Sequence, residues 1–155
     1  MRRTSSPISK LPDVLVADAN VVLSATIGGR ARDVLLDSRA PSAIAPASVG
    51  DEVLEHLPAI ARKRRLDLGV LLPVLAALPI EWVDLERYTG HEAQARHRLK
   101  GRDEDDWPVV ALALDVASQR KSLAIWTHDK DFEVSGLPTV TTGQLLDHLE
   151  GRSPP

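Results

Sequence analysis

The chain reads Val14-Leu15-Val16-Ala17-Asp18-Ala19-Asn20 near its start, an apolar run that ends on a carboxylate. A short, continuous apolar run bounded by polar residues is typical of a strand that is buried on both faces. A second run of this kind, Leu123–Trp126, is followed closely by Asp129. Strands buried on both faces belong to parallel sheets covered by helices, so the two runs favour an α/β architecture.

Strand-like and helical segments alternate through the rest of the chain. The predicted strands are 14–17, 42–46, 80–83, 123–127 and 139–141, and the predicted helices are 20–25, 31–37, 49–65, 71–78, 92–99, 108–119 and 142–151. Ser48, with Asp51 three residues later, is the predicted N-cap of the third helix. This alternation predicts a three-layer α/β/α fold with a mostly parallel central sheet.

Composition restricts the class of protein. The 155 residues suit one domain, and 43% hydrophobic with 26% charged residues indicates a globular fold. The absence of cysteine excludes disulfides and thiolate-bound metals, and it fits a reducing cytoplasm. No apolar segment is long enough to span a membrane, and none resembles a secretory signal. We expect a cytoplasmic protein without membrane contact. Its domain would cover 13–150, between an N-terminal extension at 1–12 and a flexible tail at 151–155.

Acidic residues mark the predicted ends and beginnings of several elements. Asp18 and Asp129 follow strands, Asp106 precedes the apolar helix at 108–119, and Glu52 lies in the first turn of another helix. Ligands of such folds bind at the carboxyl ends of the strands. Clustered carboxylates repel one another strongly away from water unless a cation joins them, and oxygen ligands of this kind suit Mg²⁺ or Mn²⁺. The four acids therefore predict a divalent metal centre.

The helix at 49–65 offers a choice of acids. Its apolar stripe consists of Val49, Val53, Leu57 and Ile60. Glu52 lies on the flank of this stripe, whereas Glu55 projects nearly opposite, so Glu52 is the preferred ligand and Glu55 the reserve. His56, one turn after Glu52, is expected to be a partly buried residue outside the site.

Other polar residues lie close to the predicted centre. Asp106 shares a helical face with the apolar residues that follow it, which ranks it above Asp103 and then Asp105 as a ligand. Asn20, Thr127 and Asp131 could orient a carboxylate or a bound water, or could serve as ordinary turn and capping residues.

The whole pattern resembles the PIN-domain nucleases, which include VapC-type toxins. The resemblance rests on four segments in the family's order: 14–25, 51–55, 103–114 and 127–132. The last of these, Thr127-His128-Asp129-Lys130-Asp131-Phe132, is similar to the family's closing Thr-x-Asp-x-Asp-Phe motif. The resemblance implies an endoribonuclease that uses Mg²⁺ or Mn²⁺, with Asp18, Glu52, Asp106 and Asp129 as the metal-binding and catalytic set. It also implies a homodimer and a toxin that a cognate antitoxin holds silent.

In such an enzyme a metal-activated water attacks the phosphorus in line and leaves a 5′-phosphate and a 3′-hydroxyl. Positive side chains would hold the RNA backbone. The predicted RNA-binding residues are Arg62, Lys63, Arg64, Arg98, Lys100 and Arg102.

Two other interpretations remain open. A phosphatase-like enzyme would use an Asp at a strand end as a nucleophile, but its pattern requires a second Asp where Asn20 stands. A catalytically silent RNA- or protein-binding module would keep the fold without turnover, and the full set of acids counts against it.

Overall fold

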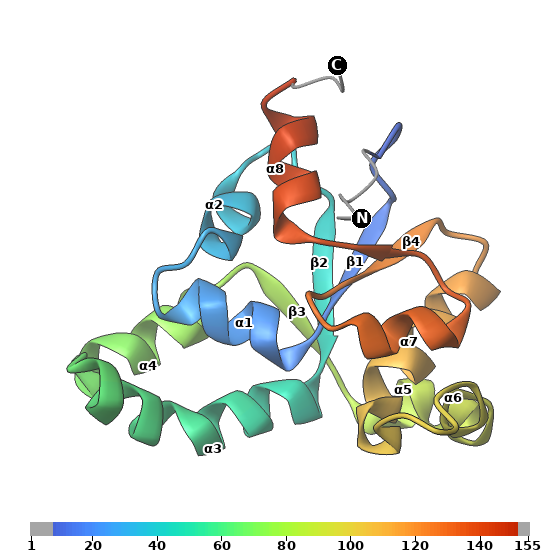
Figure 1. Ribbon diagram of the computed structural model, residues 1–155, viewed down its shortest axis with the longest axis horizontal. Coiled ribbons are helices and arrows are strands. Elements are labelled where there is room, and N and C mark those ends of the chain that lie inside the picture. The colour runs from blue at the N-terminus through green and yellow to red at the C-terminus, as the bar shows by residue number, and fades with distance from the viewer. Residues whose placement is uncertain (1–7, 152–155) are drawn as a thin grey trace, which may run out of the picture.

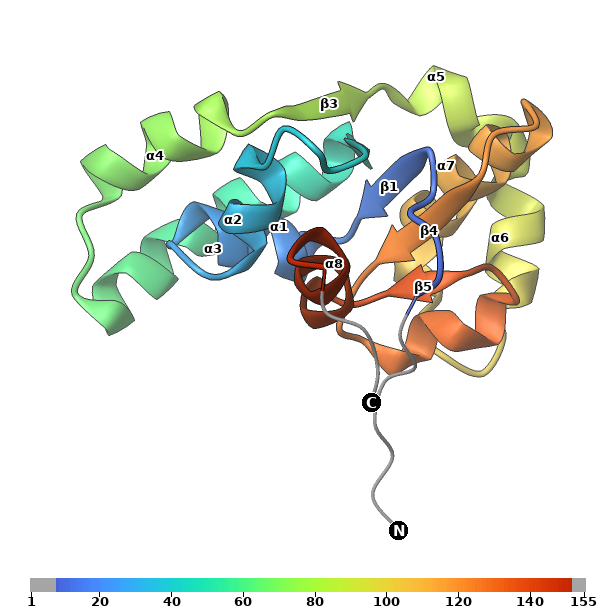
Figure 2. The same ribbon diagram turned by 90° about the horizontal axis from the view of Figure 1, so that it is seen from above.

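The computed structural model describes residues 8–151, which form one sheet between two layers of helices (Figures 1 and 2). The five strands are all parallel and lie in the order β3-β2-β1-β4-β5. The strand bounds are β1 Val14–Ala17, β2 Ser42–Pro46, β3 Ile80–Val83, β4 Leu123–Trp126 and β5 Thr139–Val140. This architecture confirms the predicted three-layer α/β/α class.

Helices connect the strands and cover both faces of the sheet. The α-helices are α1 Ala19–Thr26, α2 Ala31–Leu36, α3 Ala47–Arg64, α4 Leu68–Ala77, α5 Leu85–Tyr88, α6 Glu92–Arg98, α7 Trp107–Ser118 and α8 Thr142–Leu149. The 3₁₀ turns are η1 Thr89–His91, η2 Glu104–Asp106 and η3 Lys130–Ser135. Helices α5, α6 and α7 lie on one side of β1 and β4, and α1, α2 and α8 lie on the other (Figure 2).

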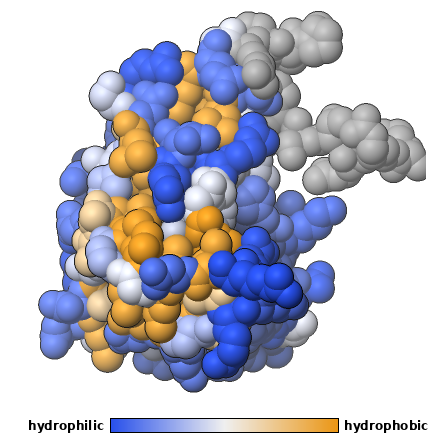
Figure 3. Space-filling model, turned by 90° about the vertical axis from the view of Figure 1, so that its left-hand side faces the viewer, coloured by the Kyte–Doolittle hydropathy of each residue, from blue (hydrophilic) through white to orange (hydrophobic). Residues whose placement is uncertain are grey.

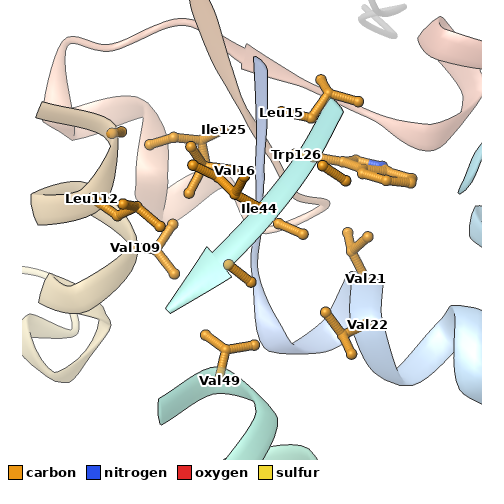
Figure 4. Close-up of a cluster of buried hydrophobic side chains, with 14 of the residues drawn as sticks. Leu15, Val16, Val21, Val22, Ile44, Val49, Val109, Leu112, Ile125 and Trp126 are labelled. Carbon is orange, nitrogen blue, oxygen red and sulfur yellow. The ribbon is translucent and has the colours of Figure 1, made fainter. Parts of the chain in front are cut away.

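The core is centred on β1 and β4. Leu15, Val16, Ile125 and Trp126 have almost no exposed surface, because both faces of these strands are covered (Figure 4). Helix α7 is buried nearly all round, as its apolar sequence predicts. Each such aliphatic side chain contributes about 1.5–3 kcal/mol when it is fully buried. The acids that follow or precede these elements are therefore attached to the buried core of the molecule.

Two helix starts differ from the prediction by more than one residue. Helix α3 begins at Ala47, directly after strand β2, and its N-cap residue Pro46 has no side-chain cap, so Ser48 and Asp51 are exposed residues inside the helix. The predicted cap at Ser48 is wrong because the chain turns at Pro46, two residues earlier. Helix α4 begins at Leu68 rather than residue 71, because the Asp67 carboxylate accepts a hydrogen bond from the Gly69 N–H.

The short helix α5 was not predicted, because four residues carry no readable helical period. Of the predicted extension at 1–12, residues 1–7 lie outside the described part, and Ile8 and Leu11 pack against the core. The predicted tail lies outside it from residue 152 onward. Within residues 8–151, no helix is both long and apolar enough to cross a membrane.

Candidate functional site

Asp18 is the most constrained acid of the site. It follows β1 and caps helix α1, accepting a hydrogen bond from the Val21 N–H at 2.9 Å. The parallel register pairs Ala17 with Trp126, so Asp18 and Thr127 leave neighbouring strands side by side. The Thr127 hydroxyl donates to the second carboxylate oxygen of Asp18. Burial raises the pKa of Asp18, and the bonds from Thr127 and Val21 oppose that rise.

Thr127 also positions the next acid. Its hydroxyl oxygen accepts a hydrogen bond from the Asp129 N–H at 2.9 Å. The Asp129 carboxylate then accepts from the Asp131 N–H at 2.8 Å and begins the turn η3. One buried hydroxyl thus links the carboxylate after β1 to the backbone after β4.

Asp106 brings the remaining acids together. It is half-buried at the start of α7, and its pKa is raised to about 7 by burial first and then by the charges of Asp103, Asp129, Asp18 and Glu52, in that order. Four other carboxylates therefore act on Asp106. They belong to the end of β1, helix α3, the residue before η2 and the turn after β4.

The start of α7 is held by aromatic packing. The ring of Trp107 lies 5.8 Å from that of Tyr88, centroid to centroid, and the Arg96 guanidinium lies 5.3 Å from the Trp107 centroid. Tyr88 is buried, so these contacts attach the turn that carries Asp106 to α5 and α6.

The structure separates the acids that the sequence left as alternatives. Among the described residues, Glu52 raises the pKa of Asp106 and Glu55 does not, and both side chains are exposed on α3. Asp103 acts on Asp106 and accepts a hydrogen bond from the Asp105 N–H at 3.0 Å, whereas Asp105 is simply exposed. Asp131 lies 3.7 Å from Arg102 in an exposed ion pair.

A small cavity lies between α1 and α3, and Glu52 is the one proposed metal ligand in its lining. It measures about 260 Å³ and is lined by Ala19, Asn20, Leu23, Glu52, Val53, His56 and Ile60. His56 is exposed here, so the prediction that it is partly buried is wrong. Residues four apart share a helical face, so the position of His56 four residues after Glu52 could have indicated that both line the same cavity.

The predicted RNA-binding side chains divide into two groups. Arg62, Lys63 and Arg64 are exposed in the last turn of α3, and Lys100 and Arg102 are exposed after α6. Arg98 is partly buried instead, and its guanidinium donates to the Ser135 carbonyl oxygen at 2.5 Å. It therefore attaches α6 to η3.

The donor set fits a hard divalent cation by its chemistry. The side chains that act on Asp106 are Asp and Glu residues, and carboxylate oxygens are the ligands that Mg²⁺ and Mn²⁺ prefer. In residues 8–151, no three Asp, Glu or His side chains already converge on one point as a metal site. Glu52 and Asp103 are both exposed to solvent.

The model of the PIN domain family matches residues 16–150, which include every acid described above. No curated protein matches the chain. PIN domains have a nuclease-type fold and generally use divalent metal ions. The match covers most of the sequence, so this chain belongs to the PIN domain family.

Proposed function

We propose that the protein is a metal-dependent endoribonuclease. It hydrolyses RNA phosphodiester bonds with Mg²⁺ or Mn²⁺ held by Asp18, Glu52, Asp106 and Asp129. The observation that carries this proposal is the placement of Asp18, Glu52, Asp103 and Asp129 around the half-buried Asp106, whose pKa is raised by burial first and then by their charges. Such crowding is costly without a cation and is the arrangement that divalent-metal hydrolysis needs.

A divalent cation in this place would lower the pKa of its bound water and neutralise charge that develops on the phosphate. The residues of the chain supply the rigidity. Asp18 is fixed by two hydrogen bonds, and Asp129 is held through its own N–H by Thr127. Glu52 is exposed and reaches the site from α3 as the adjustable member.

The direct test incubates the protein with a mixture of RNAs in Mn²⁺ and, in parallel, in excess chelator, and then maps the cut ends. We expect cleavage only with the metal, and products with a 5′-phosphate and a 3′-hydroxyl. Equal cleavage in chelator, or a 2′,3′-cyclic phosphate, would contradict the proposal. Release of phosphate from phosphomonoesters without RNA cleavage would favour the phosphatase-like alternative.

We also propose that the enzyme acts as the toxin of a toxin–antitoxin pair in the cytoplasm and forms a homodimer. Exposed apolar side chains on α4 support a protein contact: Val70 is 58% exposed and Leu72 is 41% exposed. Figure 3 shows apolar surface on the side of the molecule where the α3–α4 hairpin lies. An apolar groove of about 300 Å³ lies between α3, α4 and β3, lined in part by Leu54, Leu72 and Trp82. Exposed patches of this kind mark interaction surfaces.

Two measurements check these roles. Induced expression in a bacterial host should arrest growth, and Asp129→Asn should abolish the arrest. Sedimentation should give a dimer for the wild type and a monomer for Val70→Asp, whereas Leu85→Asp, at a 52% exposed position on α5, should stay dimeric. Unimpaired growth would contradict the toxin role, and a monomeric wild type would contradict the homodimer.

A further inference from the structure

One face of helix α3 carries a series of chemically different side chains. Glu52, His56, Ile60 and Lys63 follow at spacings of four, four and three residues, which places them on the same side of the helix. The distance along the helix from Glu52 to Lys63 is about 16 Å at the usual rise per residue. The face therefore leads from the acids of the site to the basic last turn of α3.

The cavity beside Glu52 lies under this face. Its volume is about 260 Å³, and Val53, Leu23 and Ile60 form its apolar part. A water molecule takes about 30 Å³ of the liquid, and sites for whole drug-sized ligands begin near 300 Å³. The cavity is therefore large enough to take one ring system.

Two polar side chains stand at the opening of this cavity. Asn20 on α1 and His56 on α3 are exposed, and within residues 8–151 neither side chain has a hydrogen-bond partner. The Asn20 amide offers a donor and an acceptor together, the pattern that reads the edge of a nucleobase. The His56 ring offers a flat face against which an unstacked base can lie.

We propose that this cavity binds one unstacked base of a single-stranded RNA, next to the scissile phosphate. The inference rests on the proposed ribonuclease function and specifies its substrate class. The base lies on the apolar floor between Asn20 and His56, and the ammonium group of Lys63 binds a backbone phosphate further along α3. A duplex would have to unpair a base to fill the cavity, so single strands are the preferred substrate.

The test measures binding separately from cleavage. A labelled, unstructured RNA oligonucleotide is titrated with protein in chelator, and its anisotropy gives the dissociation constant. The oligonucleotide is then replaced by versions with one abasic nucleotide at each position in turn. The proteins are the wild type, His56→Ala, Lys63→Gln and the control Lys121→Gln. Lys121 is exposed and lies before the amino-terminal end of β4, away from the carboxyl ends of the strands.

We expect His56→Ala to weaken binding of the intact RNA about tenfold, as loss of one base-stacking contact does. One abasic position should weaken binding to the wild type by a similar factor. The same abasic RNA should bind His56→Ala nearly as well as the intact RNA does, because the stacking contact is already lost in that variant. Lys63→Gln should weaken binding and reduce the salt dependence by about one phosphate contact, whereas Lys121→Gln should change neither. A base-paired duplex of the same sequence should compete poorly.

Equal binding by His56→Ala and the wild type would overturn the proposal, as would equal competition by the duplex. Cut mapping with Mn²⁺ separates this outcome from failure of the enzyme assignment. Cleavage at sites with no preference for any neighbouring base would support the nuclease assignment and exclude the base-binding site. The predicted binding pattern without any cleavage would support the base-binding site and exclude the nuclease assignment.

Discussion

At the scale of single residues, the carboxyl group of Asp106 links the site to stability. Its pKa is about 7 in the folded protein, against a usual value of 3.8. The folded state therefore holds more protons than the unfolded state between about pH 4 and pH 7. In chelator, the free energy of unfolding should fall as the pH rises through this window, because the charged form is buried among like charges.

Asp106→Asn should remove this part of the pH dependence. We expect the variant to melt a few degrees above the wild type at pH 8 and close to it at pH 4. The gain in free energy would be on the order of 1 kcal/mol, because solvent screens a half-exposed group. Thermal melts of Asp106→Asn and of Glu86→Gln, an exposed α5 control, measure the difference. A lower melting point for Asp106→Asn at pH 8 would contradict the crowding of the acids.

Glu52 and Glu55 provide the sharpest comparison on α3. Glu52 acts on Asp106 and lines the cavity beside the site, whereas Glu55 projects away from both. Glu52→Gln should cost about 100-fold in RNA cleavage at saturating Mn²⁺, the loss typical of one group that stabilises developing charge. Glu55→Gln should change the rate little, as exposed substitutions usually do. If Glu55→Gln were the inactive variant, the other face of α3 would carry the ligand.

At the scale of elements, the turn η3 depends on one partly buried arginine. Arg98 donates to the Ser135 carbonyl oxygen across the junction of α6 and η3, and Asp129 begins η3. Arg98→Ala should destabilise the protein by about 1–2 kcal/mol, because a buried carbonyl loses a charged donor. Hydrogen exchange of residues 130–136 should accelerate in the same variant. Arg102→Ala, which removes only the exposed pair with Asp131, should leave that exchange unchanged.

Strands β1 and β4 were predictable because each is a short apolar run between polar residues. Helix starts were harder, because the cap depends on a local hydrogen bond that competes with other polar residues nearby. Asp67 is the N-cap of α4. At α3 the helix begins directly after Pro46, so Ser48 lies inside the helix and cannot cap it. Asp18 and Asp129 were proposed as ligands because they follow strands, and Asp106 and Glu52 because they lie near the starts of helices. The role of Thr127 as a link between two acids could not be read from spacing, because it depends on the register of β1 and β4.

At the scale of the whole molecule, a cation that binds the folded state alone should stabilise it. Mn²⁺ at 100 times its dissociation constant would add about 2.7 kcal/mol to the free energy of unfolding. We expect the melting temperature to rise with Mn²⁺ concentration in the wild type. The rise should be largely lost in Asp18→Asn and Asp129→Asn, although both should fold without metal. An equal rise in all three proteins would show that the metal binds elsewhere.

The contact between Ile8 and His148 has a consequence for engineering. The His148 Nδ1 lies 3.3 Å from the Ile8 carbonyl oxygen, so positions 140 residues apart in sequence meet in space. Where the ends of a domain lie close together, a short linker can join them and the chain can be opened elsewhere. An opening between Arg120 and Lys121 lies in an exposed turn before β4, away from the carboxyl ends that carry the acids. A circular permutant with these new termini should keep the order of strands in the sheet, although β4 would be synthesised first. The order of strands along the chain could then be changed without changing the arrangement of the acids.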